Sequence, residues 1–145
     1  NGIKELNIDT MLTAKKSSNA GPFRMPCVQR SWTTQKRAAW AKGLDLPKKG
    51  DTVYFACCYA SYRNPKIAKA TAAILKAGGI DPAYLGEEEW CCGVPQLADG
   101  NVALAEELIQ HNVEALKAAG VKKVVTSCAG CFHALKSEYP EIIGN

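Results

Sequence analysis

From Asp51 onward, the hydrophobic residues follow two patterns, one typical of strands and one typical of helices. A near-continuous apolar run covers residues 52–57, as expected for a strand that is buried on both faces. Two shorter apolar runs, at 83–85 and 123–126, predict two further strands. Helical patterns follow each of them. This alternation predicts an α/β fold, a small parallel β-sheet with flanking helices and right-handed crossovers.

Each predicted helix begins after a residue that can cap it. The helices, with their capping residues, are expected over 65–77 after Asn64, 102–119 after Asn101 and 128–139 after Ser127. Gly78-Gly79 and Gly120 end the first two, and Pro140 is expected to end the third. The stripe of the first helix that is predicted to be buried consists of Ile67, Ala70, Ile74 and Leu75. A loop is expected over 86–100.

The first fifty residues have a different character. Residues 1–30 lack periodicity and are rich in Ser, Asn, Gly and Pro, which indicates an extended arm. A short helix is predicted from about Gln35 to Lys42, with Trp32 and Trp40 anchoring it on the body. We therefore divide the chain into an N-terminal arm over 1–50 and a domain over 51–145.

The charge of the chain is unevenly distributed between these two parts. Residues 1–50 hold ten Lys or Arg against three Asp or Glu, or +7, and residues 51–145 hold eight against eleven, or −3. A solvated arm is the expected reading, with docking on an acidic partner as the alternative. The arm lacks aromatic residues interleaved with its basic residues, which argues against nucleic-acid binding.

The composition is that of an ordinary globular protein, with 145 residues, 47% hydrophobic and 22% charged. No apolar run approaches the roughly 20 residues that a membrane-spanning helix needs, and no signal-peptide pattern opens the chain. A cytoplasmic location is expected, with attachment to a membrane-bound complex through partners left open. The chain begins at Asn1 without Met, which we interpret as a fragment or a processed product.

The seven cysteines carry the strongest chemical signal in the sequence. Their number is odd, which fits a disulfide framework poorly. They are grouped: Cys57-Cys58 follow the first predicted strand, Cys91-Cys92 lie in the loop after the second, and Cys128 and Cys131 follow the third. Functional sites of parallel sheets gather outside the carboxyl ends of the strands. All three groups are therefore expected at one edge of the sheet.

With Cys57 expected to pack in the core, five converging thiols remain, and they favour an iron–sulfur cluster over a zinc ion. Cys128 and Cys131 form a C-x-x-C at a predicted helix start, where the helix dipole favours thiolate. Zinc is normally satisfied by four ligands, and adjacent Cys91-Cys92 more easily bind different metal atoms. An iron–sulfur cluster takes thiolates by preference and spreads them over several irons. A zinc-stabilised interaction module remains the alternative.

These cysteines and their flanks resemble the cysteine-rich CCG domain found in the B-type and D-type subunits of heterodisulfide reductase. The pattern is Cys58, 32 intervening residues (59–90), Cys91-Cys92-Gly93, and Cys128-Ala129-Gly130-Cys131, with 35 residues from 93 to 127. The flanks at 55–63, 89–93 and 126–128 match as well, and residues 37–43 resemble the D-type subunit. The resemblance covers about 31–141. It extends to iron–sulfur subunits of glycolate, lactate and anaerobic glycerol-phosphate oxidation.

The resemblance implies a redox cofactor and redox partners. It implies that a non-cubane 4Fe–4S cluster is held by Cys58, Cys91, Cys92, Cys128 and Cys131. In the reductases such clusters split a disulfide in two one-electron steps, so an oxidoreductase subunit acting on a thiol/disulfide couple is expected. Expected partners carry a second cysteine-rich motif, ferredoxin-type clusters or a flavin. The alternative is an electron relay in a quinone-linked hydroxyacid or glycerol-phosphate dehydrogenase.

Other residues near the motif have less specific expectations. Cys27 and Cys57 are expected to pack rather than to bind metal, and Cys57 stands where the family usually has glycine. Arg63 could hold an anionic substrate or balance the charge of the cluster. His133 and His111 are expected to be ordinary helix residues, and Gly93 to give the backbone room beside the cluster. Glu87, Glu88 and Glu89 are expected to form a solvated run.

Overall fold

The computed structural model describes residues 4–7 and 37–144 of the chain. In this part of the chain, β2 (Thr52–Phe55) and β3 (Lys123–Thr126) pair in parallel, with Thr52 opposite Lys123 and Phe55 opposite Thr126. β1 (Lys4–Asn7) pairs antiparallel with β3, so the strand order is β1-β3-β2. The predicted α/β fold, with a small parallel sheet and flanking helices, is confirmed. Four residues of the segment predicted as an extended arm thus form an edge strand of the sheet.

The predicted strand at 83–85 is reduced to a single bridge. Ala83 pairs in parallel with Val53, and its backbone exchanges hydrogen bonds of 2.8 Å with Thr52 and Tyr54. The pairing stops there because the Tyr84 N–H donates to the carbonyl of Pro47 instead, also at 2.8 Å. Gly86 then turns the chain at a φ of 67°, a conformation that glycine adopts without strain.

The helices between the strands lie close to their predicted positions. α3 spans Pro65–Ala77, and α5 spans Val102–Ala118, with the Asn101 side chain accepting a hydrogen bond from the Leu104 N–H at 3.3 Å. The predicted loop between them holds a 3-10 turn at Gly86–Glu88 and a short helix, α4 (Val94–Ala98).

The buried face of α3 differs from the predicted stripe. The residues of α3 that are buried are Ala68, Thr71, Ala72 and Leu75. Ala70 is exposed, and Ile74 is 60% exposed. Small side chains on the buried face let α3 approach the 3-10 turn Ala38–Ala41 and the π-helical turn Tyr59–Arg63. Of the predicted stripe, Leu75 is buried and Ile67 is half-buried, while Ala68 and Ala72 take the place of Ala70 and Ile74 on the buried face.

The C-terminal helix is built of three consecutive segments rather than one. α6 (Ala129–His133) is followed by a π-helical stretch, Ala134–Glu138, and by α7 (Tyr139–Ile143). The prediction that Pro140 ends the helix is wrong, since Pro140 lies near the start of α7, which continues to Ile143. Ser127 does not cap α6. Cys128 holds that position, and the Ser127 hydroxyl instead hydrogen bonds with the Tyr54 hydroxyl at 2.9 Å.

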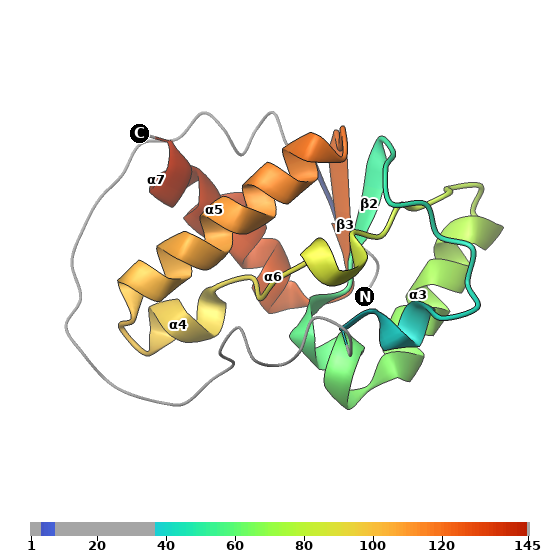
Figure 1. Cartoon of the computed structure of the whole chain (residues 1–145), viewed down its shortest axis with the longest axis horizontal. Helices are drawn as coiled ribbons and strands as arrows, with labels where there is room; N and C mark the ends of the chain where they lie inside the picture. Colours follow the sequence, from blue (N-terminus) through green and yellow to red (C-terminus); the bar gives the residue numbers. More distant parts are fainter. Residues whose placement is uncertain (1–3, 8–36, 145) are drawn as a thin grey trace.

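Helices cover the sheet from different sides. In Figure 1, α3 lies on one side of β2 and β3, while α5, α6 and α7 lie on the other. α5 and α7 contact each other, and α6 contacts β3 directly. The core between these layers includes the fully buried side chains Tyr54, Phe55, Ile109, Leu116, Leu135 and Tyr139.

Part of the predicted arm packs on this core. Trp40 is 2% exposed and lies against the rings of Tyr54 and Tyr84, with centroids 5.9 Å and 4.7 Å away. The predicted anchoring role of Trp40 is therefore confirmed, whereas Trp32 and Gln35 lie outside the described residues. The division of the chain at residue 50 stays a prediction.

Within residues 4–7 and 37–144, no helix combines the length and the apolar character that crossing a membrane requires.

Candidate metal centre

Six free cysteines gather where the two parallel strands end. Cys57 and Cys58 follow β2, and Cys128 and Cys131 follow β3, on the turn into α6 and on α6 itself. Cys91 and Cys92 come from the loop between the Ala83 bridge and α4. This is the edge of the sheet at which the sequence predicted them to meet. Cys27 lies outside the described residues.

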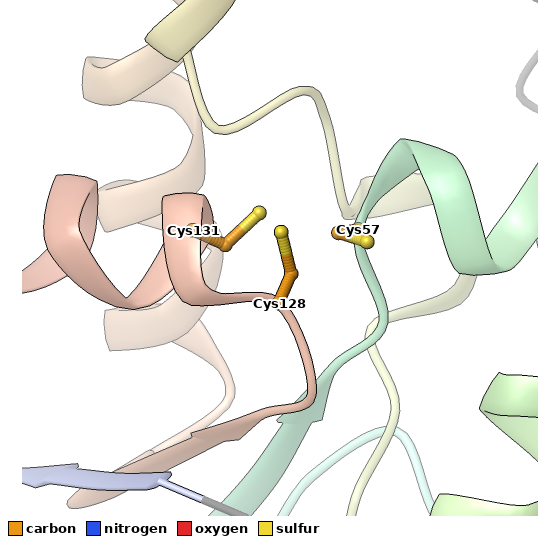
Figure 2. Close-up of side chains that lie close together, drawn as sticks. All are labelled: Cys57, Cys128 and Cys131. Atoms are coloured by element: carbon orange, nitrogen blue, oxygen red, sulfur yellow. The ribbon is translucent and has the colours of Figure 1, made fainter. Parts of the chain in front are cut away.

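Three of the sulfurs form a compact group. The Sγ atoms of Cys57, Cys128 and Cys131 all lie within 4.8 Å of one another. Figure 2 shows Cys131 on α6 and Cys128 on the turn before it, with Cys57 beside them at the end of β2. Cys57 and Cys131 are buried, and Cys128 is half-buried. Three soft sulfur donors in one place fit a thiophilic metal or an iron–sulfur cluster.

Hydrogen bonds among the three thiols of this group shift their pKa values in opposite directions. Hydrogen bonds from Cys131 and Cys57, with those of the Cys131 and Gly130 N–H groups, lower the pKa of Cys128 to about 2. The bond to Cys128 raises the pKa of Cys57 to about 12 and that of Cys131 well above its usual value. These shifts favour thiolate at Cys128 in the metal-free protein, with the Cys57 and Cys131 thiols as hydrogen-bond donors to it.

A second set of thiols continues from this group. Hydrogen bonding with Cys131 and Cys91 lowers the pKa of Cys92. A bond with Cys58 acts to lower the pKa of Cys91, but the bond to Cys92 and burial outweigh it and raise the pKa to about 11. The bond with Cys91, together with burial, raises the pKa of Cys58. All six sulfurs thus form one connected set of interacting thiols.

The backbone of Cys57 is strained. Its φ is 68°, and among the described residues it is the one non-glycine residue with a positive φ. For an L-residue with a side chain, this left-handed conformation costs about 1–2 kcal/mol. The strain explains why glycine suits this position, as the resemblance implied. In this chain the conformation is held by the Cys57 N–H, which donates to Glu89 Oε1 at 2.9 Å.

A buried ion pair supports the segment that carries Cys57 and Cys58. Arg37 Nη1 lies 2.7 Å from Glu89 Oε1, and the two side chains are 4% and 0% exposed. Glu89 also accepts hydrogen bonds from the Ala56 and Cys57 N–H groups, at 2.9 Å each. Arg37 Nη2 donates to Cys58 Sγ at 2.9 Å. The pair therefore holds both the backbone and the sulfur of the first cysteine group.

The charges of this pair stabilise each other against burial. Burial acts to lower the pKa of Arg37, but the negative charge of Glu89, together with the smaller interaction with the Cys58 sulfur, outweighs it and raises the pKa. Burial raises the pKa of Glu89, against the opposing effect of Arg37 and the two N–H donors. Because every described partner of the Glu89 oxygens is a donor, we assign Glu89 as ionised. The prediction that Glu89 belongs to a solvated run is wrong, although Glu87 and Glu88 are exposed.

Asn112 holds the second cysteine group in place. This fully buried side chain of α5 accepts from the Trp90 N–H at 2.8 Å and donates to the carbonyl of Cys91 at 2.8 Å. It also donates to the Tyr139 hydroxyl of α7 at 3.1 Å. Gln96 of α4 accepts from the Cys91 thiol at 3.7 Å. The sequence-based prediction missed Asn112, though a polar residue on the apolar face of a helix was a usable signal.

The other candidate residues each have contacts or an exposure of their own. Arg63 ends the π-helical turn after Cys58 and is exposed. His133 is 67% exposed and lies 3.2 Å from Glu138. His111 stacks on Trp90 with ring centroids 3.5 Å apart, as expected of a structural residue. Gly93 gives room to α5, because a Cβ there would lie 3.3 Å from the Ile109 side chain.

Comparison with known proteins identifies one domain family and several relatives. A family model described as the CCG cysteine-rich domain matches residues 52–136. The D subunit of the dihydromethanophenazine:CoB–CoM heterodisulfide reductase of Methanosarcina barkeri is 46% identical over 112 residues, or 74% of this chain and 27% of that protein. The EtfAB:quinone oxidoreductase of Syntrophomonas wolfei is 35% identical over 105 residues, or 69% of this chain and 15% of that protein.

A third relative extends the range of functions. The C subunit of the anaerobic glycerol-3-phosphate dehydrogenase of Escherichia coli K12 is 35% identical over 98 residues, or 66% of this chain and 24% of that protein. This chain thus spans about a quarter of the length of the heterodisulfide reductase subunits that it matches. No solved structure matches it. The family match covers more than half of the chain and includes the five-cysteine motif, and the chain belongs to the cysteine-rich CCG domain family.

Proposed function

We propose that this chain is the iron–sulfur cluster-binding part of an oxidoreductase subunit of the heterodisulfide reductase type. The observation that carries the proposal is the convergence of six cysteines from three chain segments at one edge of the sheet. Similarity to the D subunits of heterodisulfide reductases supports it. A relative from Methanococcus maripaludis, 32% identical over 138 residues, is named an iron–sulfur protein.

The proposed ligands are the five cysteines of the family motif, Cys58, Cys91, Cys92, Cys128 and Cys131, and the proposed cofactor is a non-cubane 4Fe–4S cluster. The donor set fits, because it consists of sulfur alone and already favours thiolate at Cys128 and Cys92. When bound, the cluster would supply one-electron transfer. Zinc is the alternative cofactor, although five or six thiols exceed its usual four ligands.

The proposed reaction is electron transfer to or from a thiol/disulfide couple. Cys58 and Cys128 are half-buried, whereas the other described thiols are buried, so a substrate sulfur would reach the site at one of these two cysteines. Arg63 is exposed near Cys58 along the chain and would attract an anionic thiol. We propose a cytoplasmic location and redox subunits as partners, carrying a second cysteine-rich motif, ferredoxin-type clusters or a flavin.

Metal analysis tests the cofactor directly. Protein purified without oxygen is expected to be brown and to contain iron and acid-labile sulfide, because thiolate-rich sites of this kind hold iron–sulfur clusters. The measurements are iron, sulfide and zinc analysis of one preparation, followed by EPR. Stoichiometric zinc without sulfide would contradict the proposal and leave a colourless zinc module in its place.

The runner-up function is an electron relay, in which no substrate binds at the cluster. Its support is the similarity to the EtfAB:quinone oxidoreductase and to the C subunit of anaerobic glycerol-3-phosphate dehydrogenase.

The response of the cluster to thiols separates the two functions. Adding coenzyme M or coenzyme B to the oxidised protein is expected to change its EPR spectrum. Arg63→Ala is expected to weaken the response to anionic thiols more than to neutral ones, since it removes only a charged contact. Arg63→Lys serves as the control that keeps the charge. A protein with a full cluster whose EPR spectrum is unchanged by every thiol tested supports the electron-relay function.

A further inference from the structure

We propose that Cys57 is a sixth metal ligand, and that its thiolate joins those of Cys128 and Cys131 on one metal atom. The inference rests on the proposed function, because the atom meant is an iron of the cluster that Cys128 and Cys131 would help to hold. The five-cysteine motif does not include Cys57, and the sequence alone favours packing for it.

The first argument is the position of the sulfur. The three Sγ atoms lie within 4.8 Å of one another although they come from the ends of two different strands. Two thiolates on one tetrahedral metal, with metal–sulfur bonds of about 2.3 Å, lie about 3.8 Å apart. The observed upper limit of 4.8 Å is therefore close to the separation that a three-thiolate corner requires.

The second argument is that the thiol of Cys57 is held in a fixed place. The Cys57 N–H and the neighbouring Ala56 N–H both donate to the buried carboxylate of Glu89. Cys57 is 4% exposed, so its sulfur has little freedom to turn to solvent. A ligand needs this kind of preorganisation, because a metal site loses affinity when its donors must first be ordered.

The third argument separates ligation from packing. At a φ of 68°, glycine would fit without strain, whereas cysteine fits only with strain. The residue that backbone geometry would favour here is therefore glycine. Cys57 instead places a third sulfur donor next to the C-x-x-C pair. Metal binding would explain why a cysteine stands at this strained backbone position, whereas core packing does not.

The Cys57→Gly variant is well suited to test this, because it removes the thiol and relieves the backbone in one step. The full chain and the variant are reconstituted with iron and sulfide without oxygen, and the retention of iron against a competing chelator is measured. A ligand role predicts a loss of metal affinity of about 10–100-fold or more. The EPR spectrum is expected to change as well. Unfolding of the metal-free variant is expected at the same or higher denaturant concentration.

Two further variants keep the outcome interpretable. Cys57→Ser keeps the size and the backbone strain of Cys57 but replaces the sulfur, and it is expected to lose affinity like Cys57→Gly. Cys27→Ala removes a thiol that lies outside the described residues and is expected to change nothing. Unchanged iron retention and an unchanged EPR spectrum in both Cys57 variants would overturn the inference.

The same experiment distinguishes failure of this inference from failure of the proposed function. The function is judged by whether the unaltered chain carries sulfide together with iron. The role of Cys57 is judged by the difference in metal retention between the chain and its variants, for whichever metal the chain binds. If the chain binds zinc and loses it on Cys57→Gly, the proposed function is wrong and the ligand role of Cys57 is supported. If the chain holds an iron–sulfur cluster that Cys57→Gly leaves unchanged, the proposed function is supported and the ligand role of Cys57 is wrong.

Discussion

Glu89→Ala is expected to lose about 3–5 kcal/mol of stability, because it leaves the buried guanidinium of Arg37 without its counter-charge. The substitution also leaves the N–H groups of Ala56 and Cys57 without their acceptor. A domain of this kind has only about 5–15 kcal/mol of stability in total. The measurement is urea unfolding of the metal-free chain under reducing, oxygen-free conditions.

Matched variants show whether the buried pair is the cause. Glu87→Ala removes an exposed carboxylate two residues away and is expected to stay within about 0.5 kcal/mol of the unaltered chain. Glu89→Gln keeps the shape of the side chain, but its amide nitrogen would face an N–H donor, so a large loss is still expected. A loss below about 1 kcal/mol in Glu89→Ala would show that the ion pair does not hold this segment.

Cys58→Ala is expected to lose or convert the cluster, because it removes one of the five thiolates proposed to hold it. We expect the fall in metal affinity to exceed the roughly 10–100-fold that the loss of a supporting hydrogen bond costs at metal sites. Iron and sulfide content after anaerobic reconstitution, together with EPR, measure the effect.

The contact of Cys58 with Arg37 calls for a second variant. Cys58→Ala leaves Arg37 Nη2 without its acceptor, so part of the effect could arise from the fold. Cys58→Ser keeps an acceptor for Arg37 while it removes the thiolate. A folded Cys58→Ser chain that lacks the cluster assigns the loss to ligation. A full, unaltered cluster in both variants means that the first ligand is not Cys58.

The sequence predicted the parts of the fold that local patterns determine. Asn101 caps α5 where the spacing of its apolar residues begins, and β2 and β3 follow continuous apolar runs. The meeting of the cysteine groups followed from one rule, that parallel strands end at the same edge. These features depend on neighbouring residues or on the order of strands and helices, and both can be predicted from the sequence.

What the sequence could not show depends on contacts between distant residues. Arg37 and Glu89 are 52 positions apart, and each alone looks like a surface charge. Only their pairing in the folded chain offsets the cost of burying them, so no local pattern predicts it. The burial of Thr71 and the exposure of Ile74 on α3 likewise depend on which segment packs against that helix. The left-handed backbone of Cys57 is set by Glu89 in the same way.

The distribution of the proposed ligands over three segments would give a bound cofactor a role in the lifetime of the protein. A cluster bound by the three cysteine groups would cross-link the chain. It would close one loop of 32 residues (59–90), between Cys58 and Cys91, and one of 35 residues (93–127), between Cys92 and Cys128. In the chain-entropy treatment of cross-links, closing one stretch of this size is worth roughly 3–4 kcal/mol. Loss of the cluster would therefore release both stretches at once. Proteases would then remove the damaged chains first, and the level of the protein in a cell would follow the integrity of its cluster.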